Sequence, residues 1–145
     1  MKVLCFGDSL GLPREGCKYE ETWLSLLRTK YPHHTFIDHF EGARLIDSAL
    51  SDYNTYYKYY DADVVILQQG ICDCSPRYVN DKKTSSMMIR KAFNTLGLSK
   101  LYWRIVKSHI RRPNCVYTQP VSFENKYGML MRNVLSGGGI LSLSR

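Results

Sequence analysis

The sequence lacks a long apolar run, and this absence excludes a membrane-spanning helix from its 145 residues. Such a helix needs about 20 consecutive apolar residues. The N-terminal stretch Met1–Gly7 is also too short for the apolar part of a secretory signal, and the acidic Asp8 follows it directly. We therefore expect a cytoplasmic protein. With 44% hydrophobic residues, a chain of this length suits one folded domain.

Cysteines are few, scattered and odd in number, which argues against a disulfide framework and fits a reducing compartment. The chain has five, at Cys5, Cys17, Cys72, Cys74 and Cys115. Cys72 and Cys74 form a C-x-C pair, but neither a second pair nor a nearby histidine completes a tetrahedral zinc set. We expect no metal and no cofactor.

Acidic residues are scarce in the second half of the chain. Residues 1–63 carry a net charge of −3, whereas residues 64–145 carry +10. The segment 77–112 has ten basic residues and one acid, Asp81. This asymmetry indicates either a solvated basic face or an anionic partner, such as a glycan, a lipid headgroup or a polyanion. Tyr102 and Trp103 in this segment also allow nucleic-acid binding, although no helix-turn-helix or RNA-binding motif is present.

Apolar spacing predicts strands that alternate with helices. The clearest strand is 63–68, because four consecutive apolar residues indicate burial on both faces, as in a parallel sheet between helices. We expect further strands at 2–6, 35–37 and 115–118, and helices at 20–31, 45–60, 84–96, 98–110 and 122–135. This order predicts a doubly wound parallel α/β domain. The Gly/Ser-rich tail 136–145 is expected to be flexible and outside the sheet.

Three glycine-containing segments follow predicted strands. They are Gly7-Asp8-Ser9, Glu41-Gly42-Ala43 and Gly70-Ile71-Cys72-Asp73. Ligands of open parallel sheets bind beyond the carboxyl ends of the strands, so these segments should form one site. The first also fits the G-x-S-x-G elbow of α/β-hydrolases, but that elbow follows several strands, whereas Ser9 follows the first.

These residues resemble the GDSL or SGNH hydrolases. Gly7-Asp8-Ser9-Leu10 is similar to the motif that names the family, Gly42 to its second-block glycine, and residues 70–73 to its Gly-x-Asn-Asp block. The resemblance covers residues 1–135. It implies a flavodoxin-like three-layer fold and an esterase or acylhydrolase activity on acyl esters. An acylated carbohydrate is the substrate class to test first.

The resemblance also implies roles for individual residues. Ser9 would be the nucleophile, and the N–H groups of Ser9 and Gly42 would form the oxyanion hole with the side chain at position 72. Asp8, Gly70 and Asp73 would support these loops. For Ser9 and Gly42 a plain turn role is the alternative. His39 is either a substitute base or a hydrogen-bonded loop histidine.

Two departures from the family pattern predict an impaired site. Cys72 stands at the position of the family's asparagine, and a thiol is a weak hydrogen-bond donor. No Asp-x-x-His, the family's base and its orienting acid, occurs in the chain. We therefore expect an SGNH-type domain without its C-terminal catalytic segment. The alternatives are an inactive remnant or binding module and a nucleic-acid-binding protein.

Overall fold

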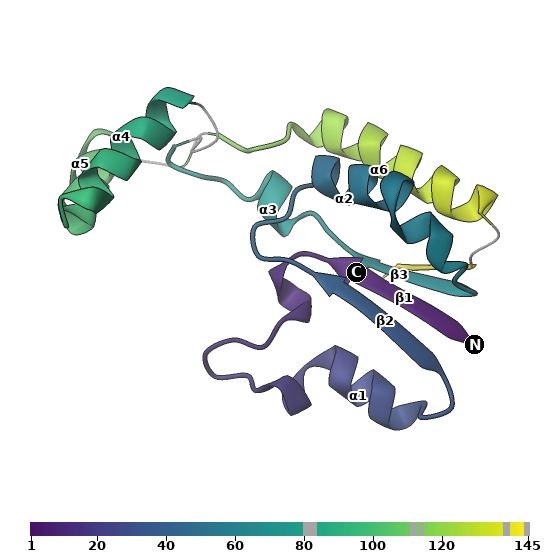
Figure 1. Ribbon diagram of the computed structural model, residues 1–145. Helices are drawn as coiled ribbons and strands as arrows, with labels where there is room; N and C mark the ends of the chain where they lie inside the picture. The colour runs from purple at the N-terminus through teal and green to yellow at the C-terminus, as the bar shows by residue number, and fades with distance from the viewer. Residues whose placement is uncertain (80–83, 111–112, 114, 138–139, 144–145) are drawn as a thin grey trace.

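The computed structural model describes the whole chain except residues 80–83, 111–112, 114, 138–139 and 144–145. Its centre is a four-stranded parallel sheet in the order β2-β1-β3-β4 (Figure 1). The strands are β1 Lys2–Gly7, β2 Thr35–Phe40, β3 Val64–Gln68 and β4 Ile140–Leu143. The predicted doubly wound α/β class is confirmed, and the strand order is that of the flavodoxin-like sheet.

Helices cover both faces of the sheet and give it three layers (Figure 1). On one face, α2 Ile46–Thr55 and α6 Pro120–Ser136 pack on Leu4, Phe6 and Leu67. On the other, α1 Trp23–Lys30 places Leu24 against Val3 and Cys5. Successive residues of β1 thus point to opposite layers, as period-2 alternation requires, and both are apolar because both layers are covered.

The predicted helices at 20–31 and 45–60 are each divided. The first splits into the 3-10 turn η2 Tyr19–Glu21 and α1, because Thr22 has an extended backbone and caps α1 by accepting a hydrogen bond from the Ser25 N–H at 3.3 Å. The second splits into α2 and the 3-10 turn η3 Tyr57–Tyr60. Asp61, with φ of 51°, ends that segment.

The predicted strand at 115–118 was wrong. Cys115 makes an isolated antiparallel bridge with Arg77, and the N–H groups of Tyr117 and Thr118 donate to the Asp73 carbonyl at 3.1 Å. These amides are therefore engaged away from the sheet. The edge beside β3 is taken instead by β4, from the tail that we expected to stay outside the sheet. Gly138 and Gly139 of that tail lie outside the described residues.

The basic segment forms helices, as predicted, but they do not lie on the flank of the sheet. Helices α4 Thr84–Thr95 and α5 Ser99–His109 form a hairpin that projects from the body (Figure 1). Gly97, with φ of 71°, makes the turn between them. Asp81, Arg111 and Arg112 of this segment lie outside the described residues. Across the described ranges, no helix is long and apolar enough to cross a membrane.

Candidate active site

The three glycine loops meet at the carboxyl edge of the sheet. The Asp8 N–H donates to the Gln68 carbonyl at 3.0 Å, and the Glu41 N–H donates to the Gly7 carbonyl at 3.2 Å. Gly7 lies between its partners in β2 and β3, and a Cβ there would come within 1.9 Å of the Gln68 carbonyl oxygen. The first loop is thus fixed to both neighbours, and only glycine fits at its start.

Ser9 is exposed at the start of the 3-10 turn η1 Ser9–Gly11, directly after the buried Asp8. The Asp8 carboxylate accepts a hydrogen bond from the Leu10 N–H at 3.1 Å and so holds the turn that presents Ser9. Among the described residues, no group is hydrogen-bonded to the Ser9 hydroxyl or to its N–H. Both groups are therefore available to a ligand that arrives from solvent.

Gly42, in the loop after β2, is also exposed. A Cβ at this position would have no neighbour within 4 Å, so packing within the described chain does not require glycine here. Its N–H donates to no acceptor in the described part of the chain. The next residue, Ala43, has φ of 59°, which is uncommon for a residue with a side chain.

Cys72 links the loops. It is buried in the short helix α3 Ile71–Cys74, and its thiol lies near the backbone of Ala43 and the carboxylate of Asp8. Burial raises the pKa of the Cys72 thiol, and the nearby Asp8 carboxylate raises it further, against the opposing effect of Arg77. Cys72 is therefore a neutral thiol at pH 7, located where the first and second loops approach the third.

Asp73 ties this edge to the helices behind it. Its fully buried carboxylate accepts hydrogen bonds from the Ile46 N–H at 3.0 Å, the Gln69 amide at 3.2 Å and the Thr118 hydroxyl at 2.6 Å. Ile46 is the first residue of α2, where a negative charge is favourable. Asp73 thus connects the β3–α3 loop, the start of α2 and the segment before α6.

Several solved structures have a similar fold, and they include proteins described as esterases and as a lipase. The esterase EstA from Pseudoalteromonas sp. matches with a TM-score of 0.57 at 14% identity over 98% of this chain and 57% of its own. The acetyl xylan esterase AlAXEase matches with 0.60 at 16% identity over 99% and 57%. A protein from Parabacteroides merdae described as a GDSL-like lipase matches with 0.53 at 13% identity over 98% and 57%.

The chain has the fold of GDSL-type esterases. The expected resemblance is thereby confirmed at the level of the fold. The chain spans 57% of the length of each of these three structures. No family model and no curated protein sequence matches it.

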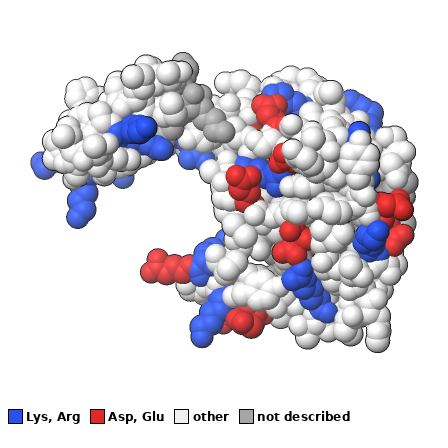
Figure 2. All heavy atoms as spheres, viewed as in Figure 1, with Lys and Arg blue, Asp and Glu red and all other residues white. Residues whose placement is uncertain are grey.

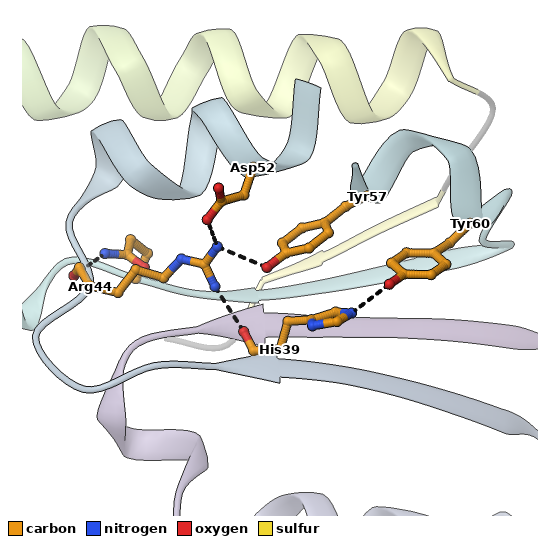
Figure 3. A network of polar contacts seen from close by, with 6 residues as sticks. His39, Arg44, Asp52, Tyr57 and Tyr60 are labelled. Atoms are coloured by element: carbon orange, nitrogen blue, oxygen red, sulfur yellow. Dashed lines mark hydrogen bonds and ion pairs between the residues drawn. The ribbon is translucent and has the colours of Figure 1, made fainter. Parts of the chain in front are cut away.

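His39 is turned away from the edge that carries Ser9. It is a strand residue of β2, not a loop residue, and its Nε2 is 3.0 Å from the Tyr60 hydroxyl. The Tyr60 carbonyl accepts from Lys2 Nζ at the amino end of the sheet, so the imidazole points toward that opposite end (Figure 3). Tyr57 stacks on the ring at a centroid distance of 4.5 Å. These contacts favour a packing role over that of a substitute base.

Arg44 organises the second loop, and the sequence analysis did not find it. Its guanidinium is buried, pairs with Asp52 and donates to the His39 carbonyl and the Tyr57 hydroxyl, each at 3.0 Å (Figure 3). Its carbonyl accepts from the Gln69 amide at 2.7 Å. No local pattern marks these partners, because they lie on α2, β2, η3 and the loop after β3. The network fixes the backbone that carries Gly42.

The His39 environment predicts a pH dependence of stability. Burial, with a further effect of Arg44, lowers the pKa of His39 below its ordinary 6.5. The unfolded chain therefore binds the proton more readily, and protonation favours unfolding. This contribution to stability is complete above pH 6.5 and is lost as the pH falls from there through the folded-state pKa. We expect His39→Gln to reduce the loss of unfolding free energy between pH 7 and pH 5.

Urea unfolding followed by circular dichroism at pH 7, 6 and 5 measures this effect. His33→Gln, at an exposed histidine, is the matched control and should keep the parent's pH dependence. If the unfolding free energy fell equally between pH 7 and pH 5 in the parent and in His39→Gln, the pKa of His39 would be the same in the folded and the unfolded chain, and the prediction would be wrong.

Proposed function

We propose that this chain provides the nucleophile and oxyanion hole of a serine ester hydrolase, with Ser9 as the attacking residue. The observation that carries the proposal is the combination of an exposed Ser9 hydroxyl with backbone N–H groups, at Ser9 and Gly42, that have no acceptor in the described chain. Free donors beside a nucleophile suit the negative charge that develops on a carbonyl oxygen. The GDSL-type fold supports the same assignment.

In the proposed reaction, the Ser9 hydroxyl oxygen attacks the ester carbonyl and loses its proton to a base. The carbonyl oxygen becomes an oxyanion that accepts from the Ser9 and Gly42 N–H groups. The C–O bond to the alcohol then breaks, the alcohol leaves with a proton, and an acyl-enzyme remains. Water releases the acyl group by the same steps.

The third oxyanion donor is weak in this chain. The neutral Cys72 thiol replaces the carboxamide of the family pattern, and loss of one oxyanion donor costs about 10² to 10³ in rate. With His39 directed toward Tyr60, the described residues also supply no evident base beside Ser9. We therefore propose slow turnover by the chain alone. Among the ester substrates, we would test acetylated carbohydrates first, because AlAXEase is an acetyl xylan esterase.

A serine-directed phosphonate tests the proposal directly, because it needs the nucleophile and the oxyanion hole but no deacylation. We expect slow labelling of one serine, located at Ser9 by mass spectrometry of proteolytic fragments. Ser9→Ala should abolish the label. Ser48→Ala, which removes another exposed serine, should leave it unchanged.

Two results would contradict the proposal. A label that persists in Ser9→Ala would place the reactive group elsewhere. A parent chain that stays unlabelled after prolonged exposure would favour the inactive remnant or binding module.

A further inference from the structure

The α4–α5 hairpin combines basic and apolar side chains on an open surface. Residues 84–109 contain no acid and five Lys or Arg residues, namely Arg90, Lys91, Lys100, Arg104 and Lys107. Figure 2 shows basic and no acidic side chains over the visible face of this hairpin. Seven large aliphatic side chains in it are exposed, namely Met87, Met88, Ile89, Leu96, Leu98, Leu101 and Ile105.

Helices α4 and α5 bury only a small part of their apolar surface against each other. The Phe93 and Tyr102 rings meet at 5.5 Å, and the Leu98 N–H donates to the Phe93 carbonyl at 2.8 Å. In the described chain, Tyr102 is the one buried residue of the pair of helices. Leu96 is 71% exposed and Met88 is 64% exposed. The hairpin therefore keeps an apolar surface that neither helix covers.

Each helix separates its two kinds of side chain. In α5, Leu101 and Ile105 are four residues apart and share a face, whereas Lys100, Arg104 and Lys107 recur on another. In α4, Met88 and Ala92 are also four residues apart, and Lys91 lies to one side of them; Leu96 follows at the same spacing just after the helix ends. Cations beside an aliphatic face characterise helices that lie in the headgroup region of a membrane.

We propose that the α4–α5 hairpin binds the surface of an anionic lipid bilayer, with its aliphatic side chains at the acyl boundary and its basic side chains among the headgroups. The charge is complementary to an anionic surface. A second copy of the same hairpin would place cations against cations. Nucleic acid explains the charge but leaves the seven exposed aliphatic side chains without a role, because bases stack on aromatic rings.

The hairpin projects from the body on the side to which the strands point, which is the side of the sheet's carboxyl edge (Figure 1). Figure 2 shows a broad hollow between the hairpin and the body on this side. Binding through the hairpin would therefore keep the carboxyl edge of the sheet close to the lipid surface. The binding step itself does not use Ser9, so its test is independent of the proposed hydrolase activity.

Co-sedimentation of the full chain with vesicles tests the proposal. We expect binding to vesicles of phosphatidylcholine with one third phosphatidylglycerol, and much weaker binding to phosphatidylcholine alone. Each basic side chain near an anionic surface strengthens binding about fivefold, so Lys100→Gln, Arg104→Gln and Lys107→Gln together should weaken it about 100-fold. Leu101→Ser with Ile105→Ser should weaken it about tenfold or more while leaving the charge unchanged. A nitroxide-labelled lipid should quench Trp103 fluorescence, and Trp103→Phe should remove that quenching.

The control has the same kinds of change on α1. Leu26→Ser with Lys30→Gln removes an exposed leucine and a basic residue and should bind like the parent. Circular dichroism checks that each variant keeps the parent's helical content. Vesicle binding that is absent, or that survives the triple charge variant, would overturn the proposal. Binding to single-stranded RNA without binding to vesicles would identify a nucleic-acid surface instead, and a chain that dimerises through Leu101 and Ile105 in solution would identify a contact between copies.

Discussion

Hydrolysis of nitrophenyl acetate should rise about 10²- to 10⁴-fold when the chain is extended by a C-terminal segment that places an Asp-x-x-His beside Ser9. A serine hydroxyl is a poor nucleophile at neutral pH unless a neighbouring base takes its proton. In the structure, the Ser9 hydroxyl is exposed and no described group is hydrogen-bonded to it. The fold and the three loops are in place, so the added base would act on the proposed site at Ser9.

The reference for this gain is the chain alone, for which we expect slow or undetectable turnover. Oxyanion donors without a triad retain about 10³ to 10⁴ over water in serine proteases, so a weak Ser9-dependent rate is compatible with the proposal. In the chain extended by the Asp-x-x-His segment, Ser9→Ala should abolish the increase in hydrolysis. Replacing the added histidine by alanine should do the same. Robust turnover by the chain alone that depends on Ser9 and survives His39→Ala would show that another base exists.

The sheet could be predicted because its strands carry a strong local pattern. Residues 64–67 are four consecutive apolar residues, and such a run is typical of a strand covered on both faces. The three glycine loops could then be placed at one edge, since parallel strands end on the same side. Gly7 is an example. It lies so close to the Gln68 carbonyl that no side chain fits, and the glycine required there marks the end of the strand in the sequence.

The missed elements depend on contacts between distant segments. The strand β2 continues beyond the predicted range 35–37 through Asp38, His39 and Phe40, because they pair with residues 5–7 of β1. Residues 115–118 have strand propensity, but their amides bond to the carbonyls of Arg77 and Asp73. Strand propensity is a property of a single segment, whereas here the hydrogen-bond partners in distant segments determine whether a strand forms.

The positions of the three loops of the candidate site could be predicted from the sequence, whereas the side-chain contacts that fix these loops could not. Ser9, Gly42 and Cys72 are found at one edge because each follows a strand. Arg44 was missed because its guanidinium contacts Asp52 and Tyr57, at separations of 8 and 13 residues, which match no short motif. His39 could not be oriented from the sequence, because its direction depends on the position of Tyr60.

Replacing Asp73 by alanine should lower the free energy of unfolding by about 4 kcal/mol, because two buried donors lose their acceptor, the half-buried Gln69 amide loses one of its two, and each unsatisfied buried group costs about 1 to 3 kcal/mol. The donors are the Ile46 N–H, the Gln69 amide and the Thr118 hydroxyl. They belong to separate segments, so a shift of one segment cannot satisfy all three. Asp73→Asn keeps the shape but turns one acceptor into a donor, and it should cost about half as much. Urea unfolding at pH 7 gives these differences.

Asp47 offers a matched control in the same helix. It also lies in the first turn of α2, but its side chain is 61% exposed and pairs with Lys126 at the surface. Exposed ion pairs contribute about 0 to 1 kcal/mol, so Asp47→Ala should have a small effect. The losses of unfolding free energy caused by Thr118→Val and Asp47→Ala should nearly add in the double variant. Those of Thr118→Val and Asp73→Ala should be strongly non-additive, since Asp73 and Thr118 share a hydrogen bond of 2.6 Å. If Asp73→Ala cost no more than Asp47→Ala, the buried carboxylate would not be what joins the β3–α3 loop to the start of α2, and the order of the candidate site would have to come from the Arg44 network alone.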